Sequence, residues 1–127
     1  MIKKRILCVD DESMNLELLK AILTPLGYDI LTANTGKEGF ENLLGGGIDL
    51  VILDVSMPDM NGYEVCKKIK HDERTSGIPV VLLSGLSDTE EMNRGFSMGC
   101  DDFLSKPFER VEFIGRIKSV LTKFETE

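Results

Sequence analysis

Three aspartates stand directly after short apolar segments of the sequence. Asp10 and Asp11 follow residues 6–9, and Asp54 follows residues 50–53. If these segments are neighbouring parallel strands, their carboxyl ends meet at one edge of the sheet, and the three carboxylates converge there. Two unit charges about 5 Å apart repel by roughly 3 kcal/mol at an effective dielectric of about 20, so such a cluster requires a cation. Mg²⁺ suits it, because Mg²⁺ binds oxygen ligands, retains water and accepts phosphate.

Two more polar side chains follow predicted strands. Ser84 follows residues 80–83 and offers a hydroxyl donor, and Lys106 follows residues 102–105 with Pro107 behind it. A lysine supplies a mobile positive charge that suits phosphate oxygens. The peptide bond before the proline is a candidate for the cis form, which would direct the lysine inward. Taken singly, each of these residues and each aspartate has an ordinary alternative as a turn residue, helix cap or solvated side chain. Their shared position after strands favours a site.

Short apolar runs predict the strands that position these residues. Runs of four apolar residues at 6–9, 50–53 and 80–83 do not alternate with polar residues, which is typical of strands buried on both faces of a parallel sheet. Two weaker strands, 30–33 and 102–105, are expected at the sheet edges.

Helical spacing of apolar residues fills the gaps between the strands. Five strand–helix repeats with right-handed crossovers predict an α/β fold with a doubly wound, five-stranded parallel sheet and helices on both faces. A flavodoxin-like strand order, 2-1-3-4-5, places the ligand site between the first and third strands. The residues that mark the five helices are Leu19, Ile22, Leu23 and Leu26; Phe40, Leu43 and Leu44; Tyr63, Cys66 and Ile69; Met92 and Phe96; and Ile114, Ile117, Leu121 and Phe124.

Length and composition narrow the class of protein. The 127 residues suit one domain spanning 1–127, and the net charge of −7 argues against direct nucleic-acid binding or an anionic membrane surface. No apolar run approaches about 20 residues, and no secretion signal is apparent, so membrane insertion and export are not expected. The three cysteines, Cys8, Cys66 and Cys100, are odd in number and widely spaced. They are expected to be reduced and buried, in a cytoplasmic protein.

The ordered motifs resemble those of the receiver domain of two-component response regulators. They span nearly the whole chain, and the ordered set is far more specific than any one motif. The matching segments are Val9-Asp10-Asp11-Glu12 with Asn15; Leu53-Asp54 followed by Met57-Pro58-Asp59-Met60-Asn61-Gly62; Ser84-Gly85; and Gly99-Cys100-Asp101-Asp102-Phe103-Leu104-Ser105-Lys106-Pro107-Phe108.

The resemblance implies a phosphoacceptor and a metal site. Asp54 would accept a phosphoryl group. Asp11 would bind Mg²⁺ directly, and Asp10 would bind it directly or through water, with Asp54 and the backbone carbonyl of Ser56 as further ligands. Ser56 and Leu86 occupy positions that tune the rate of dephosphorylation in the family.

The resemblance also implies a switch. Ser84 would bond a phosphoryl oxygen and Lys106 would pair with it. Phe103 occupies the family's aromatic switch position, which turns inward on activation; the alternative is a core residue that never moves. Phe103 replaces the frequent tyrosine, so a switch there must depend on packing. Ser84 replaces the frequent threonine and keeps the hydroxyl, and Gly85 replaces the frequent alanine. The readout face would be the fourth helix, fifth strand and fifth helix.

The phosphoryl donor must come from another protein. His71 is the only histidine, and its charged neighbours indicate a solvated loop residue. The donor would be a sensor histidine kinase or a phosphotransfer protein. The chain would promote its own phosphorylation and dephosphorylation without being an enzyme, and would control an effector protein or a fused output domain. Whether phosphorylation also produces a homodimer stays open.

Two alternatives are weaker. One is a small phosphatase or phosphotransferase that works through an aspartyl phosphate, which would need a substrate-binding cap. The other is an interaction module independent of phosphorylation, which would lack an acid or the lysine.

Overall fold

One parallel sheet forms the centre of the molecule. In a computed structural model, which describes residues 3–85 and 89–125, five strands pair in the order β2-β1-β3-β4-β5. This order confirms the prediction, including the two edge strands, and each predicted strand lies within one residue of its observed bounds. The strands are β1 (Arg5–Val9), β2 (Asp29–Ala33), β3 (Leu50–Asp54), β4 (Val80–Ser84) and β5 (Asp102–Ser105).

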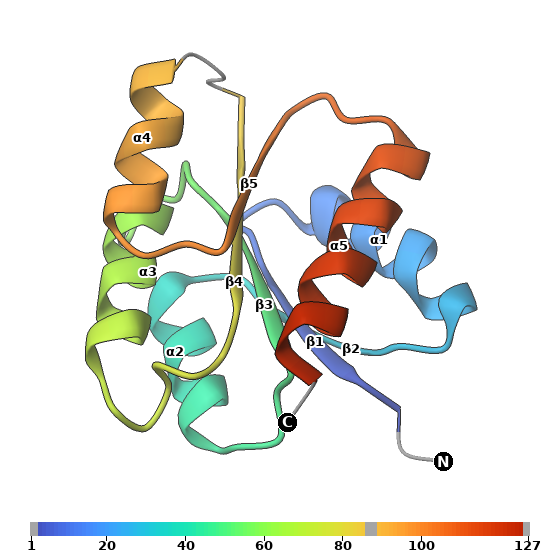
Figure 1. Cartoon of the computed structure of the whole chain (residues 1–127), viewed down its shortest axis with the longest axis horizontal. Coiled ribbons are helices and arrows are strands. Elements are labelled where there is room, and N and C mark those ends of the chain that lie inside the picture. The colour runs from blue at the N-terminus through green and yellow to red at the C-terminus, as the bar shows by residue number, and fades with distance from the viewer. Residues whose placement is uncertain (1–2, 86–88, 126–127) are drawn as a thin grey trace.

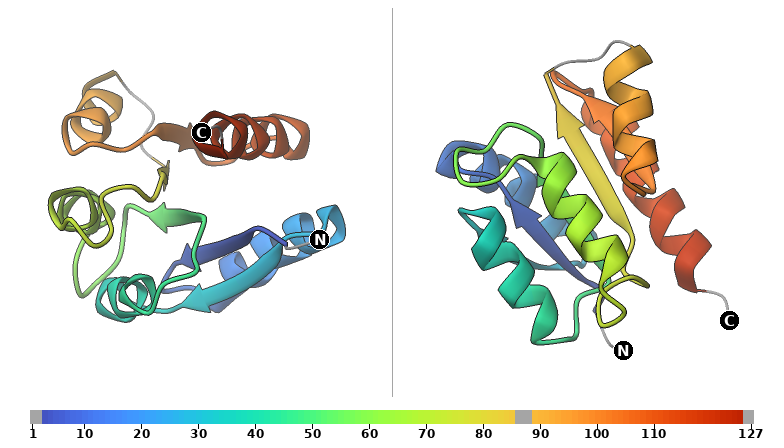
Figure 2. Two further views of the ribbon diagram at one scale, coloured as in Figure 1. Left: turned by 60° about the horizontal axis from the view of Figure 1, so that its bottom comes forward. Right: turned by 90° about the vertical axis from the view of Figure 1, so that its left-hand side faces the viewer.

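Helices cover both faces of the sheet, as the doubly wound fold requires. The helices α2, α3 and α4 lie on one face and α1 and α5 on the other (Figure 1; Figure 2). The bounds are α1 (Ser13–Leu23), the 3₁₀ helix η1 (Thr24–Leu26), α2 (Gly36–Leu44), α3 (Gly62–His71), α4 (Thr89–Ser97) and α5 (Arg110–Glu125).

Two apolar layers hold the helices against the sheet. The layer under α1 and α5 includes Leu19 and Phe113, and the layer under α2, α3 and α4 includes Phe40 and Tyr63. All three cysteines are buried and free, as predicted. Burial of this kind supplies most of the favourable free energy of folding, at about 25 cal/mol per Å² of apolar surface.

The loop after β3 is fixed by a close backbone contact at Gly62. A Cβ atom at this position would lie 2.5 Å from the backbone oxygen of Asp54, so only glycine fits. The Gly62 amide donates to the carbonyl of Val55 at 2.8 Å, and the Asn61 side chain caps α3 by accepting from Glu64 N at 2.9 Å. The start of α3 is therefore held directly against the end of β3.

The predicted helix α4 is present, but the apolar residues that marked it do not form its packed face. Met92 and Phe96 are 37% and 46% exposed, and the buried residue of this helix is Gly95. The helix approaches the sheet so closely that a Cβ atom on Gly95 would lie 2.8 Å from the Phe103 ring and 3.2 Å from the Leu82 side chain. A glycine therefore makes the contact that larger apolar residues were expected to make.

Three other predicted helix contacts also lie at the surface. Leu26 lies in η1, beyond the end of α1 at Leu23, and Leu44 and Phe124 lie at or next to the last residues of α2 and α5.

Candidate functional site

The three carboxylates predicted from the strand ends come together. Asp54 is the last residue of β3, and Asp10 and Asp11 follow β1, which pairs with β3 in register from Ile6↔Leu50 onward. One carboxylate oxygen from each aspartate lies within 4.8 Å of the others. Asp10 and Asp54 are 1% and 6% exposed, whereas Asp11 is exposed. The cluster is therefore partly buried and open to solvent on one side.

The ammonium group of Lys106 lies between the two buried carboxylates. It hydrogen-bonds Asp54 Oδ1, and its Nζ atom is 3.7 Å from Asp10 Oδ2. The backbone amide of Lys106 donates to the Ser84 carbonyl at 2.7 Å, which ties the lysine to the end of β4. The Lys106–Pro107 peptide bond is cis, as predicted.

Burial and negative neighbours shape the ionisation of Asp54. Burial raises the pKa of the Asp54 carboxyl above its usual value of 3.8, and the charges of Asp10 and Asp11 act in the same direction. The hydrogen bond and positive charge of Lys106 lower the pKa but do not cancel the rise. A divalent cation among these carboxylates would favour the ionised form that a nucleophile needs.

The donor set fits a hard cation. Three aspartates supply only oxygen ligands, and the exposure of Asp11 leaves room for retained water, which are the conditions that Mg²⁺ prefers. Ser56 is exposed directly beyond β3, next to Val55. The structure thus brings together the aspartates predicted as ligands, and their metal-binding roles stay predictions.

The predicted switch residues lie on paired strands. Ser84 ends β4 and is 2% exposed, and Phe103 lies on β5, 3% exposed, opposite Leu82. The Phe103 ring is in the inward position, against Gly95 of α4. Its movement on activation stays a prediction. Leu86, predicted from the resemblance to tune the rate of dephosphorylation, lies outside the described residues.

The single histidine stands apart from the cluster. His71 is the last residue of α3, rather than a loop residue, and it is exposed, with Nδ1 2.8 Å from the Lys67 carbonyl. Asp54 lies at the opposite end of this helix, so His71 is roughly 13 Å away along the helix axis. The prediction of a solvated histidine outside the site is confirmed.

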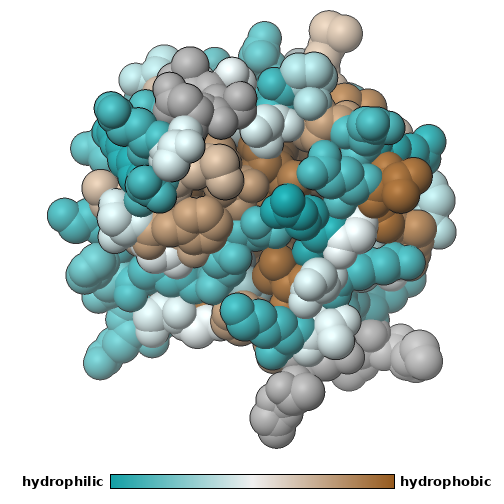
Figure 3. All heavy atoms as spheres, turned by 45° about the horizontal axis from the view of Figure 1, so that its top comes forward, coloured by the Kyte–Doolittle hydropathy of each residue, from teal (hydrophilic) through white to brown (hydrophobic). Residues whose placement is uncertain are grey.

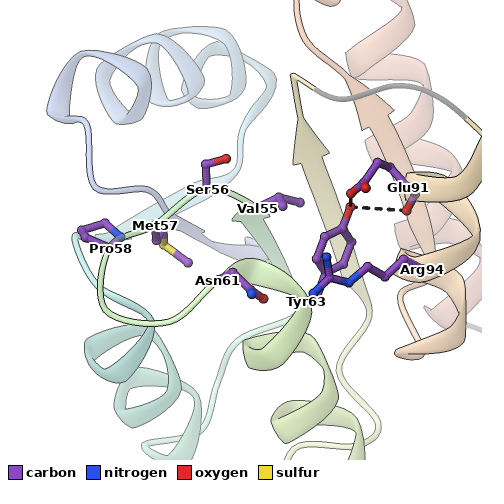
Figure 4. Close-up of a pocket in the computed structure, with 8 residues that line it drawn as sticks. All are labelled: Val55, Ser56, Met57, Pro58, Asn61, Tyr63, Glu91 and Arg94. Carbon is purple, nitrogen blue, oxygen red and sulfur yellow. Dashed lines mark hydrogen bonds between the residues drawn. The ribbon is translucent and has the colours of Figure 1, made fainter.

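Sequence reasoning missed a polar contact between α3 and α4. A pocket of about 460 Å³ at the loop between β3 and α3 is lined by residues that include Ser56, Asn61 and Tyr63 (Figure 4). The Tyr63 hydroxyl donates to Glu91 Oε1 at 2.6 Å, and the Arg94 guanidinium lies 4.3 Å from the centre of the Tyr63 ring. Tyr63 and Glu91 are 28 residues apart, and no sequence pattern pairs them.

A second, more apolar groove adjoins the cluster on the α1 side. It has a volume of about 220 Å³, and its polar residues are Asp10, Asn15 and Lys106, with Leu18 and Phe108 among its apolar residues. Leu18 is half-exposed. Hydrophobic groups lie exposed among hydrophilic ones on the face that Figure 3 shows.

The fold and this site define a known class of protein. The sequence model of the response regulator receiver domain family matches residues 6–118, so the chain belongs to that family and is a receiver domain of two-component signalling. The chain is 40% identical over 121 residues to the probable transcriptional regulator ycf27 of Cyanidium caldarium, which covers 95% of this chain and 47% of that protein. It is also 40% identical over 121 residues to the response regulator PleD of Caulobacter vibrioides, and the alignment covers 95% of this chain and 26% of PleD.

Solved structures agree with the family. A CheY-like response regulator receiver domain protein from Methanospirillum hungatei superposes with a TM-score of 0.90 at 29% sequence identity and covers 98% of both chains. The chain spans about half the length of the ycf27 relative and about a quarter of PleD. Within residues 3–85 and 89–125, no helix has both the length and the apolar composition to cross a membrane.

Proposed function

We propose that Asp54 accepts a phosphoryl group from a sensor histidine kinase or a phosphotransfer protein, in a Mg²⁺-dependent reaction that the chain itself promotes. The observation that supports this most directly is the convergence of Asp10, Asp11 and Asp54 around the ammonium group of Lys106. Asp10, Asp11, Asp54 and the backbone carbonyl of Ser56 would hold the Mg²⁺ ion, which would offset negative charge on the carboxylates and the transferred group.

The residues of the chain have distinct tasks in this reaction. A carboxylate oxygen of Asp54 attacks the phosphorus in line, the new O–P bond forms as the donor's N–P bond breaks, and the donor imidazole keeps the electron pair. Lys106 offsets charge on the phosphoryl oxygens, and the Ser84 hydroxyl donates to one of them. The same acyl phosphate is later hydrolysed at this site, with water as the acceptor.

The surroundings of the acceptor favour a protein donor over a small substrate. A phosphatase of the alternative class would need a substrate-binding cap over Asp54, and residues 3–85 and 89–125 form no such element. The groove next to Asp10 and Lys106 instead includes the apolar side chain of Leu18, which is 52% exposed, and Met14, elsewhere on α1, is 84% exposed. Exposed apolar groups next to a reactive centre are typical of a protein-binding surface. All the acids and the lysine are present, so the phosphorylation-independent alternative has no support.

The output follows from the readout face. We propose that phosphorylation changes the surface of α4, β5 and α5, and that this surface controls an effector protein or a fused output domain, with a homodimer as one form of the active state. The names of the relatives support an output in transcription for some members of the family. Residues 1–127 would form one receiver domain that acts in the cytoplasm.

Intact mass spectrometry tests the acceptor. With a small phosphodonor and Mg²⁺, the protein should gain the mass of one phosphoryl group, the label should be released by hydroxylamine, and chelation of Mg²⁺ should prevent labelling. Asp54→Asn should gain none. Asp59→Asn makes the same chemical change in the same loop but outside the cluster, so it should label normally. Equal labelling of Asp54→Asn would place the acceptor elsewhere, His71 included.

A further inference from the structure

Asn15 makes two hydrogen bonds to carboxylates at the edge of the acidic cluster. Its Nδ2 atom lies 3.1 Å from Asp10 Oδ2 and 3.0 Å from Glu12 Oε1. A side-chain amide carries two N–H donors, so one can serve each carboxylate. The opposite orientation of the amide would place its oxygen against two negative charges. The contacts therefore fix which way the Asn15 side chain points.

The carboxylate of Asp10 is held by protein donors on both oxygens. Oδ1 accepts from the backbone amide of Glu12 at 3.0 Å, and Oδ2 accepts from Asn15, with Lys106 Nζ 3.7 Å away. Asp10 is 1% exposed, so solvent contributes little to its orientation. The first turn of α1 thus sets the plane of a carboxylate whose oxygen lies within 4.8 Å of those of Asp11 and Asp54.

Asn15 occupies a position in α1 from which a side chain can cap the N-terminus of the helix. It is the third residue of the helix, where a side chain often bonds the backbone amide of the N-cap residue, here Glu12. That amide is bonded by Asp10 Oδ1 instead. The Asn15 side chain is therefore directed at the carboxylates and not at the helix backbone.

We infer that Asn15 is a positioning residue for the cation site, which acts through Asp10 by fixing the orientation of its carboxylate. This inference rests on the proposed role of Asp10 in binding Mg²⁺. Residues that orient a metal ligand by hydrogen bonding commonly change metal affinity 10–100-fold when they are replaced. Because this cation would retain water and make few protein contacts, the effect should be at the lower end of that range.

A purely structural role for Asn15 makes a different prediction. If its bonds only tie Glu12 to the first turn of α1, their loss would lower the thermal stability of the protein in chelator and leave Mg²⁺ affinity unchanged. A positioning role changes the Mg²⁺ dissociation constant with little change in that stability. The two measurements together separate the roles.

The test is a Mg²⁺ titration of the whole chain, followed by NMR of backbone and side-chain amides. Asn15→Leu keeps the size of the side chain and removes the donor, and it should raise the Mg²⁺ dissociation constant about ten-fold. Asn15→Ala checks the same loss without a bulkier apolar group. Asn15→Gln keeps the amide donor and should recover part of the affinity. Asn93→Leu, the same change at an exposed position of α4, should bind Mg²⁺ like the wild type.

The outcomes separate this inference from the proposed function. If the wild type binds Mg²⁺ and Asn15→Leu binds it within two-fold as tightly, the positioning role is wrong and the receiver assignment stands. If Asn15→Gln is as weak as Asn15→Leu and both lose thermal stability in chelator, the role is structural and the inference fails. If the wild type neither binds Mg²⁺ nor accepts phosphate, both the inference and the proposed function fail.

Discussion

The contact between α4 and β5 should make Gly95 intolerant of even one methyl group. In Gly95→Ala, the new Cβ atom would lie 2.8 Å from Cδ2 and 3.2 Å from Cε2 of Phe103, and 3.2 Å from Leu82 Cδ1. Phe103 is 3% exposed and Leu82 fully buried, so neither side chain can swing into solvent without losing its own burial. Either α4 must lift from the sheet or the ring must leave its place.

The magnitude follows from two opposing effects. Alanine in place of glycine stabilises an exposed helix interior by up to about 1 kcal/mol, partly by restricting the unfolded chain. Inserting a methyl group into a filled core costs about 1–3 kcal/mol. Because a carbon–carbon contact near 2.8 Å is far inside the optimum of about 3.5–4.0 Å, the steric cost should dominate. We expect Gly95→Ala to be less stable than the wild type by about 1 kcal/mol.

Gly115 provides the matched control. It lies in α5, and a Cβ atom there would meet nothing within 4 Å. Gly115→Ala should therefore stabilise the protein by up to about 1 kcal/mol, which leaves about 2 kcal/mol between the two variants. Urea unfolding followed by far-UV circular dichroism measures this difference, since the chain has no tryptophan. If Gly95→Ala were stabilised as much as Gly115→Ala, the close packing of α4 on Phe103 would be refuted.

Two further predictions concern ionisation. The pKa of the Asp54 carboxyl is raised in the folded state, so the folded protein binds the carboxyl proton more tightly than the unfolded chain does. The free energy of unfolding therefore falls as the pH rises from 3.8, the usual carboxyl pKa, through the raised pKa of the folded state. In chelator, the free energy of unfolding of Asp54→Asn should therefore rise relative to that of the wild type as the pH increases across that window. Urea unfolding at a series of pH values measures this difference, and a variant that becomes less stable than the wild type with increasing pH would contradict the prediction. Burial raises the pKa of each cysteine thiol to about 12. Iodoacetamide at about pH 8 should therefore label no cysteine in the native protein and all three in denaturant, as measured by intact mass. Labelling of the native protein as fast as of the denatured protein would show that the thiols are accessible. The three are Cys8, Cys66 and Cys100.

The parts of the fold that the sequence predicted well depend on local patterns. Unbroken apolar runs identified β1, β3 and β4, and the polar residue directly after each run identified where a site would be built. Parallel strands bring their carboxyl ends to one edge whatever the details of helix packing, so Asp10, Asp11 and Asp54 could be placed together without knowing any other contact. Lys106 followed from the same rule applied to β5.

The parts that could not be predicted depend on contacts between distant segments. The spacing of Met92 and Phe96 indicated a packed face. Both residues are exposed, however, and α4 lies close to the sheet because Gly95, which has no side chain, contacts the Phe103 ring. Periodicity counts apolar side chains, so it cannot identify a glycine whose lack of a side chain allows the close contact. The Tyr63–Glu91 hydrogen bond likewise joins two helices through polar atoms, which no apolar pattern reports.

On the proposed function, these distant contacts provide a route from Asp54 to the proposed readout face. Lys106 follows β5, and Phe103 lies three residues before it, roughly 10 Å along the strand, where it packs against Gly95. We propose that a shift of Lys106 towards a phosphoryl group would be transmitted to α4 through this strand. We expect α4 to respond most to that shift, because its buried residue is a glycine and little buried side-chain surface resists its displacement. Gly95→Ala should consequently still accept phosphate on Asp54, yet show a smaller change in the NMR shifts of α4 than the wild type when a phosphoryl mimic such as beryllofluoride is added. A beryllofluoride-induced change on α4 as large as in the wild type would rule out this route.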